Sequence, residues 1–576
     1  MAEAIDVFRS EDFYDYGRFL WARKILEDAL DLYSCSFGDT DLGLSQLRTR
    51  YSTAKPSDIW AATADSGENP FRDLLPEWVD GEIRDFAPDV VGLSFAFDEQ
   101  LIPGMTVARH VKAHWDLPVY AGGSMVTRLK DDLPSQEPFD SLIDDYLPYE
   151  SEAQFGDIID RLEGKATGDQ GALLEVCPDF DDLPLDEYFL PTLILPYITS
   201  RGCSFGKCLY CVHYKTYERF VYGDAVTTVR HLRSLADRYH CQHFHFVDEA
   251  LEPRFGRELA KELESHGCDY RWMVFGRIHR AWTLEVVQTI ARSGCRRLIF
   301  GLDAATDRLQ QIMKKNTDLK HAENVLAWCA QERIAAQVNF ITGYPTETKE
   351  EALEALRFIE RNRTSLRTVG VSVAVSNFAM VRGAGLDQMS AKISKDSDKP
   401  FQIYYDYHPH SGLNMKEAAT LGQFVQTSAD RILGSSKRFP LLREMAFLYN
   451  DRFGRDQVVP RTDIAPPTDS SIQWFSHDLR ALGALIATSR AGLEERAEEY
   501  LSVWWRLACE ADVRSISRGG DIHGYQLSGI FTDNAFELCI VDSFSIAGGD
   551  ADPAFPAPNG GSGDEALAVI AASAPM

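Results

Sequence analysis

Between residues 193 and 375, short apolar runs alternate with helical patterns six times. The runs have the length of strands, and the intervening segments carry the i, i+3, i+4 spacing of amphipathic helices. Such an alternation predicts parallel strands joined by helices. Six repeats in roughly 190 residues are too few for an eight-fold barrel, so we expect a partial (β/α)6 barrel. The expected strands are residues 193–200, 243–247, 271–275, 297–301, 335–342 and 368–375.

A second alternation precedes the barrel region and predicts a doubly wound parallel sheet. Ligands of such sheets bind at the carboxyl ends of the strands, and Gly122 and Gly123 follow the second strand. Residues 1–75 show helical patches and polar turns, without the first strand that such a domain normally has. The expected strands lie in 89–97, 118–124 and 139–147, and the expected helices in 77–86, 101–115 and 150–162.

These patterns divide the α/β chain into five parts. Residues 396–545 are expected to be mainly helical, with helices at 414–450 and 476–512 and a short strand-like stretch at 528–544. The last part is rich in Gly, Ala and Pro and is expected to be disordered. The parts are 1–165 (doubly wound sheet), 166–192 (linker), 193–395 (barrel), 396–545 (C-terminal domain) and 546–576 (tail).

Charge and composition exclude several classes of partner and location. The 576 residues carry a formal net charge of −28, which argues against affinity for nucleic-acid backbone or an anionic membrane. The N-terminal stretch is acidic and lacks the apolar core of a signal peptide. No apolar run approaches the roughly 20 residues that span a bilayer. Eight of the eleven cysteines are scattered singly, so we expect a reducing, cytoplasmic location.

The remaining three cysteines, Cys203, Cys208 and Cys211, follow the first barrel strand with C-x4-C-x2-C spacing. A structural zinc site needs four ligands, and a histidine at position 213 would complete a cramped set. A disulfide does not suit the compartment and would leave an odd cysteine, and a redox C-x-x-C would not need Cys203. A loop of three thiolates suits a 4Fe-4S cluster with one iron left free. The cluster is our interpretation, with zinc and a purely structural role as alternatives.

The cysteine loop also has an aromatic residue, Tyr210, before its last cysteine. A loop of this kind on the first strand of a partial barrel resembles the radical S-adenosylmethionine (radical SAM) superfamily. That family usually has C-x3-C-x2-C spacing, so this loop is one residue longer. The resemblance implies that the free iron chelates SAM. It also implies SAM-binding residues after the later strands, here Asp248, Glu249, Arg277, Gly301, Asp303, Asn339 and Gly343.

The doubly wound region resembles the cobalamin-binding domain that precedes the barrel in one class of radical SAM enzymes. The family motif that supplies a histidine to cobalt, Asp-x-His-x-x-Gly, is absent here, as is typical of that class. The resemblance implies that the corrin ring is lined by Ser94, Gln100, Gly122, Gly123, Ser124, Tyr149 and Glu150.

Together the two resemblances imply a cobalamin-dependent radical SAM methyltransferase. Such an enzyme generates a 5′-deoxyadenosyl radical and methylates an unactivated carbon of a natural-product or peptide substrate, with electrons from a flavodoxin- or ferredoxin-type donor. One alternative keeps the radical chemistry but catalyses a rearrangement, cyclisation or epimerisation. The other is a non-catalytic metal-binding recognition protein.

Overall fold

The computed structural model describes residues 1–44, 46–165, 174–217, 219–368, 370–385, 388–433 and 443–455, together with four strands between 511 and 572. The chain divides into two compact units. The first comprises Met1–Ser435 and Leu441–Val458, and the second comprises Ser436–Pro440 and Val459–Met576. The sequence-based domain boundaries within these units remain predictions. Among the described residues, no helix is both long enough and apolar enough to cross a membrane.

A six-stranded parallel sheet forms the centre of the first unit, and its strands follow one another in chain order. All six expected barrel strands are therefore confirmed. In the register of the sheet, Met273 lies opposite His245 on one side and Arg297 on the other. The strands are β6 (Ile194–Tyr197), β9 (His243–Leu251), β10 (Arg271–Gly276), β11 (Cys295–Asp303), β12 (Ala335–Thr342) and β13 (Val373–Asn377).

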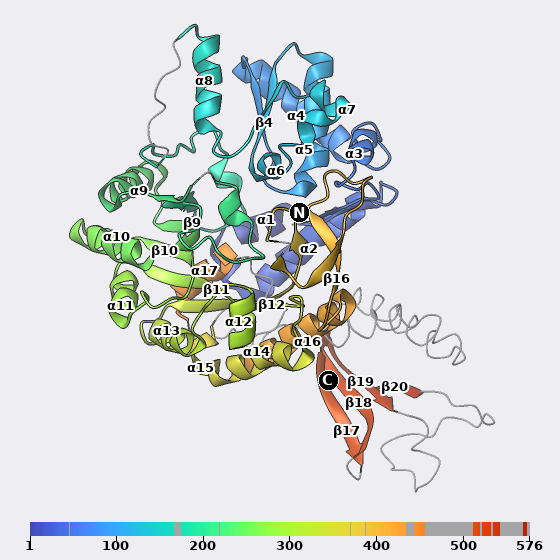
Figure 1. The fold of residues 1–576 in the computed structure, drawn as a ribbon, viewed down its shortest axis with the longest axis vertical. Coiled ribbons are helices and arrows are strands. Elements are labelled where there is room, and N and C mark those ends of the chain that lie inside the picture. Colours follow the sequence, from blue (N-terminus) through green and yellow to red (C-terminus); the bar gives the residue numbers. More distant parts are fainter. Residues whose placement is uncertain are drawn as a thin grey trace, which may run out of the picture. The chain divides into compact units, whose positions relative to one another are not determined.

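Helices cover one face of this sheet, as Figure 1 shows. Alternate strand residues such as Phe244, Trp272 and Phe300 are fully buried beneath them and form the main hydrophobic core. Capping side chains begin several helices, and Thr348 and Glu351 form a complete capping box. The helices are α9 (Ala225–Tyr239), α10 (Pro253–Ser265), α11 (Leu284–Arg292), α12 (Asp307–Ile312), α13 (Leu319–Gln331), α14 (Lys349–Arg361) and α15 (Arg363–Leu366).

The opposite face of the sheet receives a helix from much later in the chain, α17 (Arg443–Phe453). His243 and His245 point away from the core residues between them, because side chains alternate along a strand. Nε2 of His243 lies 2.9 Å from Oδ2 of Asp451, and Nδ1 of His245 lies 3.0 Å from Oε1 of Glu444. The other described helix of this region, α16 (Met415–Leu433), packs on β12, β13 and α14.

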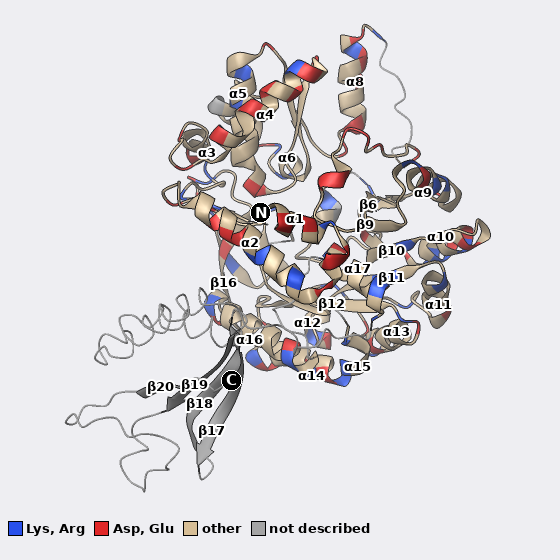
Figure 2. Cartoon of the chain, turned by 180° about the vertical axis from the view of Figure 1, so that it is seen from behind, with Lys and Arg blue, Asp and Glu red and all other residues tan. Residues whose placement is uncertain are grey.

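The first residues of the chain pack on α17, an arrangement that the sequence did not indicate. α1 (Ala2–Phe8) and α2 (Tyr16–Ser34) flank a short turn that carries Phe13, and Figure 2 shows them beside α17. The hydroxyl of Tyr449 donates to the carbonyl of Phe13 at 2.6 Å, and the centroids of the two aromatic rings are 5.4 Å apart. These helices therefore complete the barrel region.

The expected doubly wound sheet is present as three parallel strands in the order β3-β4-β5. Among the described residues before it, the only strands are a short antiparallel pair, β1 (Asp41–Leu42) and β2 (Leu47–Arg48). The small sheet consists of β3 (Val91–Ser94), β4 (Val119–Gly122) and β5 (Asp145–Leu147), with α3 (Pro56–Ala62), α4 (Phe71–Phe86), α5 (Leu101–His114), α6 (Ser124–Arg128), α7 (Glu137–Asp140) and α8 (Glu152–Leu162).

The region after the barrel contains more strand than its sequence predicted. β14 (Met380–Val381), β15 (Ala391–Ser394) and β16 (Tyr404–Pro409) form an antiparallel sheet within the first unit. β17 begins at Ala511, where a helix to residue 512 was expected, and β20 lies in the tail that was expected to be disordered. Most of the expected helix 476–512 lies outside the described residues. The second unit's sheet consists of β17 (Ala511–Arg518), β18 (Asp521–Phe531), β19 (Asn534–Val541) and β20 (Ala568–Ala572).

Candidate functional site

The three clustered cysteines lie on one loop at the carboxyl end of β6. The loop follows β7 (Ser200–Arg201), which pairs with β8 (Val221–Tyr222). It bends at Gly202 and Gly206, whose φ angles of 81° and 54° favour glycine. Burial raises the pKa of Cys211 to about 11, and Cys208 and Cys203 add to this rise. The three thiols do not converge on a single metal-ion position in this structure, and binding a metal centre would release their protons.

Backbone hydrogen bonds hold the loop between two other segments. The amide of Leu209 donates to the carbonyl of Met313 at 3.1 Å. The carbonyl of Leu209 accepts from the amide of Gly385 at 2.7 Å. The side chain of Leu209 is buried among apolar residues that include Tyr344 and Phe378. Leu209, which lies between Cys208 and Cys211 in the sequence, is therefore held by backbone hydrogen bonds to two other segments.

The two acidic residues expected near SAM have different surroundings. Asp248 is 2% exposed, and its carboxylate accepts from Oγ1 of Thr199 at 2.8 Å and from the hydroxyl of Ser200. Burial raises the pKa of Asp248 to about 6. Oε2 of Glu249 lies 3.2 Å from Nδ1 of His213, whose pKa it raises. Asp248 thus fixes the strand that leads into the cysteine loop, while Glu249 borders the end of that loop.

The structure brings Tyr210, Asp303 and Arg277 together beside the cysteines. The hydroxyl of Tyr210 donates to Oδ2 of Asp303, and Nζ of Lys315 lies 2.6 Å from the same oxygen. Nη2 of Arg277 donates to the carbonyl of Lys315 at 2.7 Å. Asp303 has a φ of 68°, so its backbone is in the left-handed region. These contacts connect the cysteine loop to the carboxyl ends of β10 and β11.

The expected residues on β11 and β12 form the adjoining part of the site. Gly301 lies opposite Asn339, and a Cβ atom at Gly301 would lie 3.2 Å from Nζ of Lys315. The amide of Gly343 donates to the carboxylate of Glu347, and the carbonyl of Gly343 accepts from the hydroxyl of Tyr407 at 3.0 Å. Burial raises the pKa of Glu347 to about 7. The turn after β12 is therefore fixed by its own side chains.

At the carboxyl ends of β3 and β4, three of the expected corrin residues contact the backbone of residues 95–97. Oε1 of Gln100 accepts from the amides of Ala96 and Phe97, and the hydroxyl of Ser124 donates to the carbonyl of Ala96. Gly123 has a φ of 99°, and a Cβ atom there would lie 2.5 Å from the carbonyl oxygen of Phe95.

The outer positions of this edge are more open. Ser94 ends β3 with an exposed side chain. Gly122, the neighbour of Gly123, is itself tightly packed, because a Cβ atom there would lie 3.0 Å from Oγ of Ser151. These glycines therefore permit close packing within the turn itself, and the open surface of the edge lies around Ser94.

The third strand end of the small sheet contacts the cysteine loop region. Tyr149 has a φ of 65°, and its amide donates to Oγ1 of Thr127 at 2.8 Å. Nη2 of Arg201 lies 2.6 Å from Oε1 of Glu152 at the start of α8. Burial raises the pKa of Tyr217 to about 12, and both Glu249 and Glu150 add to this rise. Residues expected to line two different cofactors therefore lie around one tyrosine.

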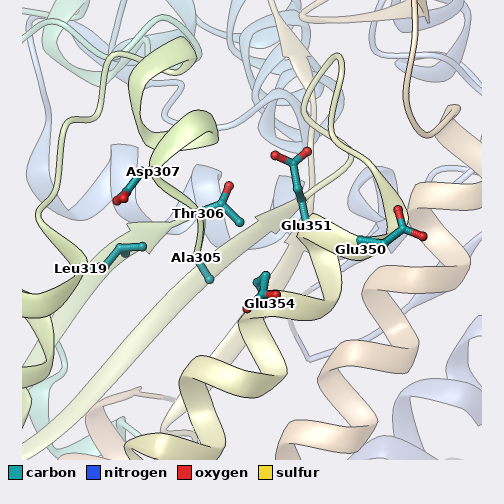
Figure 3. A pocket seen from close by; sticks show the side chains of 7 residues that line it. All are labelled: Ala305, Thr306, Asp307, Leu319, Glu350, Glu351 and Glu354. Carbon is teal, nitrogen blue, oxygen red and sulfur yellow. The ribbon is translucent and has the colours of Figure 1, made fainter.

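A surface pocket of about 390 Å³ lies apart from the expected cofactor residues (Figure 3). Thr306 caps α12, and Glu351 pairs with Arg308 and accepts from the amide of Thr348. Within the described residues, no three His, Cys, Asp or Glu side chains are arranged to hold a single metal ion. The pocket is lined by Ala305, Thr306, Asp307, Leu319, Glu350, Glu351 and Glu354.

Sequence reasoning missed two residues of the site, Lys315 and Phe205. Lys315 belongs to a polar stretch after the fourth barrel strand, and only the fold brings its ammonium to Asp303. Phe205 lies in the spacer between the first two cysteines, beneath the guanidinium of Arg277. An aromatic residue in a loop of glycine, serine and lysine was the available signal.

Residues 197–359 match the family model of the radical SAM superfamily. The matched range runs from the end of β6 into α14 and includes the cysteine loop, Asp248, Arg277 and Asp303. The chain thus carries a radical SAM domain between residues 197 and 359.

Known proteins resemble larger parts of the chain. The structure of the radical SAM methyltransferase TsrM from Kitasatospora setae, with cobalamin and a 4Fe-4S cluster bound, covers 69% of this chain and 96% of its own, with a TM-score of 0.50 and 14% identity. At that identity the likeness shows the fold.

Two curated relatives match at the level of sequence. An uncharacterized methyltransferase of Pyrococcus horikoshii is 24% identical over 306 residues, which are 48% of this chain and 65% of the relative. Bacteriochlorophyllide d C-12(1)-methyltransferase of Chlorobaculum tepidum is 24% identical over 176 residues, which are 30% of this chain and 38% of the relative. The chain therefore spans less than two thirds of either relative.

Proposed function

We propose that this radical SAM enzyme binds a 4Fe-4S cluster, SAM and cobalamin, and that it methylates an unactivated carbon of a small-molecule or peptide substrate. The observation that carries the proposal is the contact between two strand-end regions. The cysteine loop at the end of β6 meets the end of the small parallel sheet through Arg201 and Glu152. Ligands of parallel sheets bind at this edge, so cofactors of both parts would face one another.

The cysteine loop fits an iron–sulfur cluster. Its three thiols belong to one glycine-containing loop, and Leu209, between the last two cysteines, is fixed on both sides. Thiolates are the usual cluster ligands, and three of them leave one iron for another ligand. Cys203, Cys208 and Cys211 would hold the cluster, and Tyr210 would border the SAM beside it.

The edge of the small sheet fits a flat, largely apolar ligand such as a corrin. Phe97, in the loop after β3, is 67% exposed. Tyr404 of β16 is 53% exposed, and its pKa is raised by burial and by the nearby Asp98 and Glu99. Exposed aromatic rings near this edge would offer such a ligand an apolar surface. Ser94, Gly122 and Tyr149 would line the same edge.

When bound, the cluster and SAM supply hydrogen-atom abstraction, and cobalamin supplies a methyl group. The chain's own residues then have positioning roles. Asp248 holds the strand that enters the cysteine loop, Tyr210 and Asp303 hold the end of that loop, and Glu347 holds the turn after β12. A flavodoxin- or ferredoxin-type donor would provide electrons. The singly scattered cysteines support a location in the cytoplasm, and the formal charge of −28 argues against nucleic-acid and membrane partners.

Cofactor stoichiometry tests the proposal. The protein would be purified anaerobically, reconstituted with iron, sulfide and hydroxocobalamin, desalted and analysed for iron and corrin. We expect about four irons and about one cobalamin per chain. Replacing the three loop cysteines by alanine should abolish iron binding, while the matched control Cys268→Ala should not.

The other outcomes separate the alternatives. Iron at the expected level without cobalamin would contradict methyl transfer from cobalamin and favour another radical reaction. A protein that binds no iron would contradict radical chemistry altogether and favour a recognition role.

A further inference from the structure

The four-residue spacer between Cys203 and Cys208 is fixed by side chains from two barrel strands. The hydroxyl of Ser204 donates to Oε2 of Glu252 at 2.9 Å, after the end of β9. The guanidinium carbon of Arg277, after the end of β10, lies 3.5 Å from the ring centroid of Phe205. A cation at this distance over an aromatic face is strongly attracted. The spacer is therefore a supported element with its own contacts.

Arg277 is also an unusual cation for its position. In the part of the chain that the structure describes, it forms no ion pair with a carboxylate, and its Nε is buried without a hydrogen-bond partner. Burial lowers the pKa of Arg277, and Cys208 and Cys203 act in the opposite direction. Its only side-chain hydrogen bond in the described residues goes to the neutral carbonyl of Lys315. Among the described residues the guanidinium thus has no carboxylate at ion-pair distance, and Cys208, Cys203 and Glu252 all interact favourably with its positive charge.

We propose that Arg277 is a positioning residue for the iron–sulfur cluster that stacks on Phe205 to hold the long spacer and places a positive charge beside Cys203 and Cys208. The inference rests on the proposed function, because it presupposes a cluster on these thiolates. A nearby positive charge stabilises the reduced, more negative cluster and so raises its reduction potential. Stacking and charge are two separable contributions of one side chain.

Three variants separate these contributions. Arg277→Gln removes the charge and the stacked cation, Arg277→Lys keeps the charge but loses the planar group, and Phe205→Leu removes the ring. The matched control is Arg254→Gln, because Arg254 is exposed on α10 and pairs with Glu258. Each reconstituted holoenzyme would be titrated electrochemically with detection by electron paramagnetic resonance. The rate of iron loss to a chelator would be measured as well.

We expect Arg277→Gln to reduce the ratio of reduced to oxidised cluster about tenfold at a fixed potential, which equals a shift of about 59 mV for a one-electron couple. Arg277→Lys should keep the wild-type potential but lose iron about threefold faster than the wild type. Phe205→Leu should show the same potential and the same faster loss of iron. The control should match the wild type in both measurements.

An unchanged potential in Arg277→Gln would overturn the proposal, as would an unchanged rate of iron loss in both Arg277→Lys and Phe205→Leu. If Arg277→Gln does not fold, the neutral variant Arg277→Met takes its place in the potential measurement, while Arg277→Lys and Phe205→Leu decide by the rate of iron loss. A wild-type protein that takes up no iron would instead contradict the proposed function, so the two failures are distinguishable.

Discussion

The ammonium of Lys315 lies 2.6 Å from Oδ2 of Asp303, and both side chains are about nine-tenths buried. A buried ion pair contributes little net stability, but removing one partner leaves an uncompensated charge in a poorly solvated place. This pair lies beside Gly301 and Tyr210, so it determines how the end of β11 meets the cysteine loop.

We therefore predict that Asp303→Asn destabilises the protein by about 3–5 kcal/mol. Asparagine tolerates the left-handed backbone at this position, so the loss would come from the unpaired Lys315. The double variant Asp303→Asn/Lys315→Met should recover part of the loss. Urea unfolding of the three proteins measures the difference. A double variant that is less stable than Asp303→Asn alone would contradict the explanation.

Gly123 offers a test of the small sheet. A Cβ atom at this glycine would lie 2.5 Å from the carbonyl oxygen of Phe95, and its φ is 99°. We predict that Gly123→Ala destabilises this region by about 2 kcal/mol or more and lowers cobalamin binding. Gly164→Ala is the matched control, since Gly164 also has a positive φ but no atom within 4 Å of the added Cβ. Thermal unfolding and corrin content should separate the variants, and equal effects would argue against crowding at Gly123.

The carboxyl group of Glu347 makes stability depend on pH. Its pKa is raised from 4.5 to about 7 in the folded protein, so the folded state binds more protons than the unfolded state between these values. The stabilisation is complete below pH 4.5 and is lost as the pH rises through 7. It amounts to at most about 3 kcal/mol.

We predict that Glu347→Gln, which retains an acceptor for the amide of Gly343, reduces the loss of stability between pH 5 and pH 8. Asp248, with a pKa raised to about 6, is unchanged in this variant and contributes the remaining loss. Denaturant midpoints of both proteins at several pH values measure the effect. Parallel curves for the wild type and the variant would contradict it.

The contact of Arg297 with α17 gives the fourth prediction. Arg297 is fully buried and donates to Oδ1 of Asn450 at 3.0 Å and to Oε1 of Gln337 at 2.6 Å. Replacing Asn450 by leucine leaves a buried guanidinium with one acceptor fewer, which should cost about 1–3 kcal/mol. Chemical unfolding followed by circular dichroism measures the change. A variant as stable as the wild type would mean that water or another group replaces the lost acceptor.

The sequence predicted those features of the fold that depend on local patterns. All six barrel strands and the three strands of the small sheet follow from apolar runs between helical segments. The cysteine loop followed from its spacing, and its two glycines have the positive φ angles that such a loop requires. Tyr210, Arg277 and Asp303 were expected in one site because of the resemblance to the radical SAM superfamily.

Contacts between distant segments could not be predicted in this way. The region after residue 396 was expected to be mainly helical, but β16 pairs there with β14 and β15, which come before it. Strand pairing of this kind depends on tertiary packing more than on local propensity. The contacts of Lys315 with Asp303, and of the two histidines with α17, likewise join segments that are distant in the sequence, so no local pattern predicts them. Asp248 was expected to face SAM. Its hydrogen bonds to Thr199 and Ser200 join two segments that are distant in the sequence, so the local pattern did not predict them.

The position of α17 has a consequence for protein synthesis. Arg297 and its acceptor Asn450 are separated by 153 residues, and Phe13 and its partner Tyr449 by 436 residues. The last strand of the sheet, β13, ends at Asn377, and α17 begins at Arg443. A ribosome that adds roughly 5–20 residues per second needs roughly 3–13 s to cover that separation. During that time the nascent barrel exposes the face that α17 later covers. The growing chain must therefore stay soluble with one face of its central sheet uncovered until α17 has been translated.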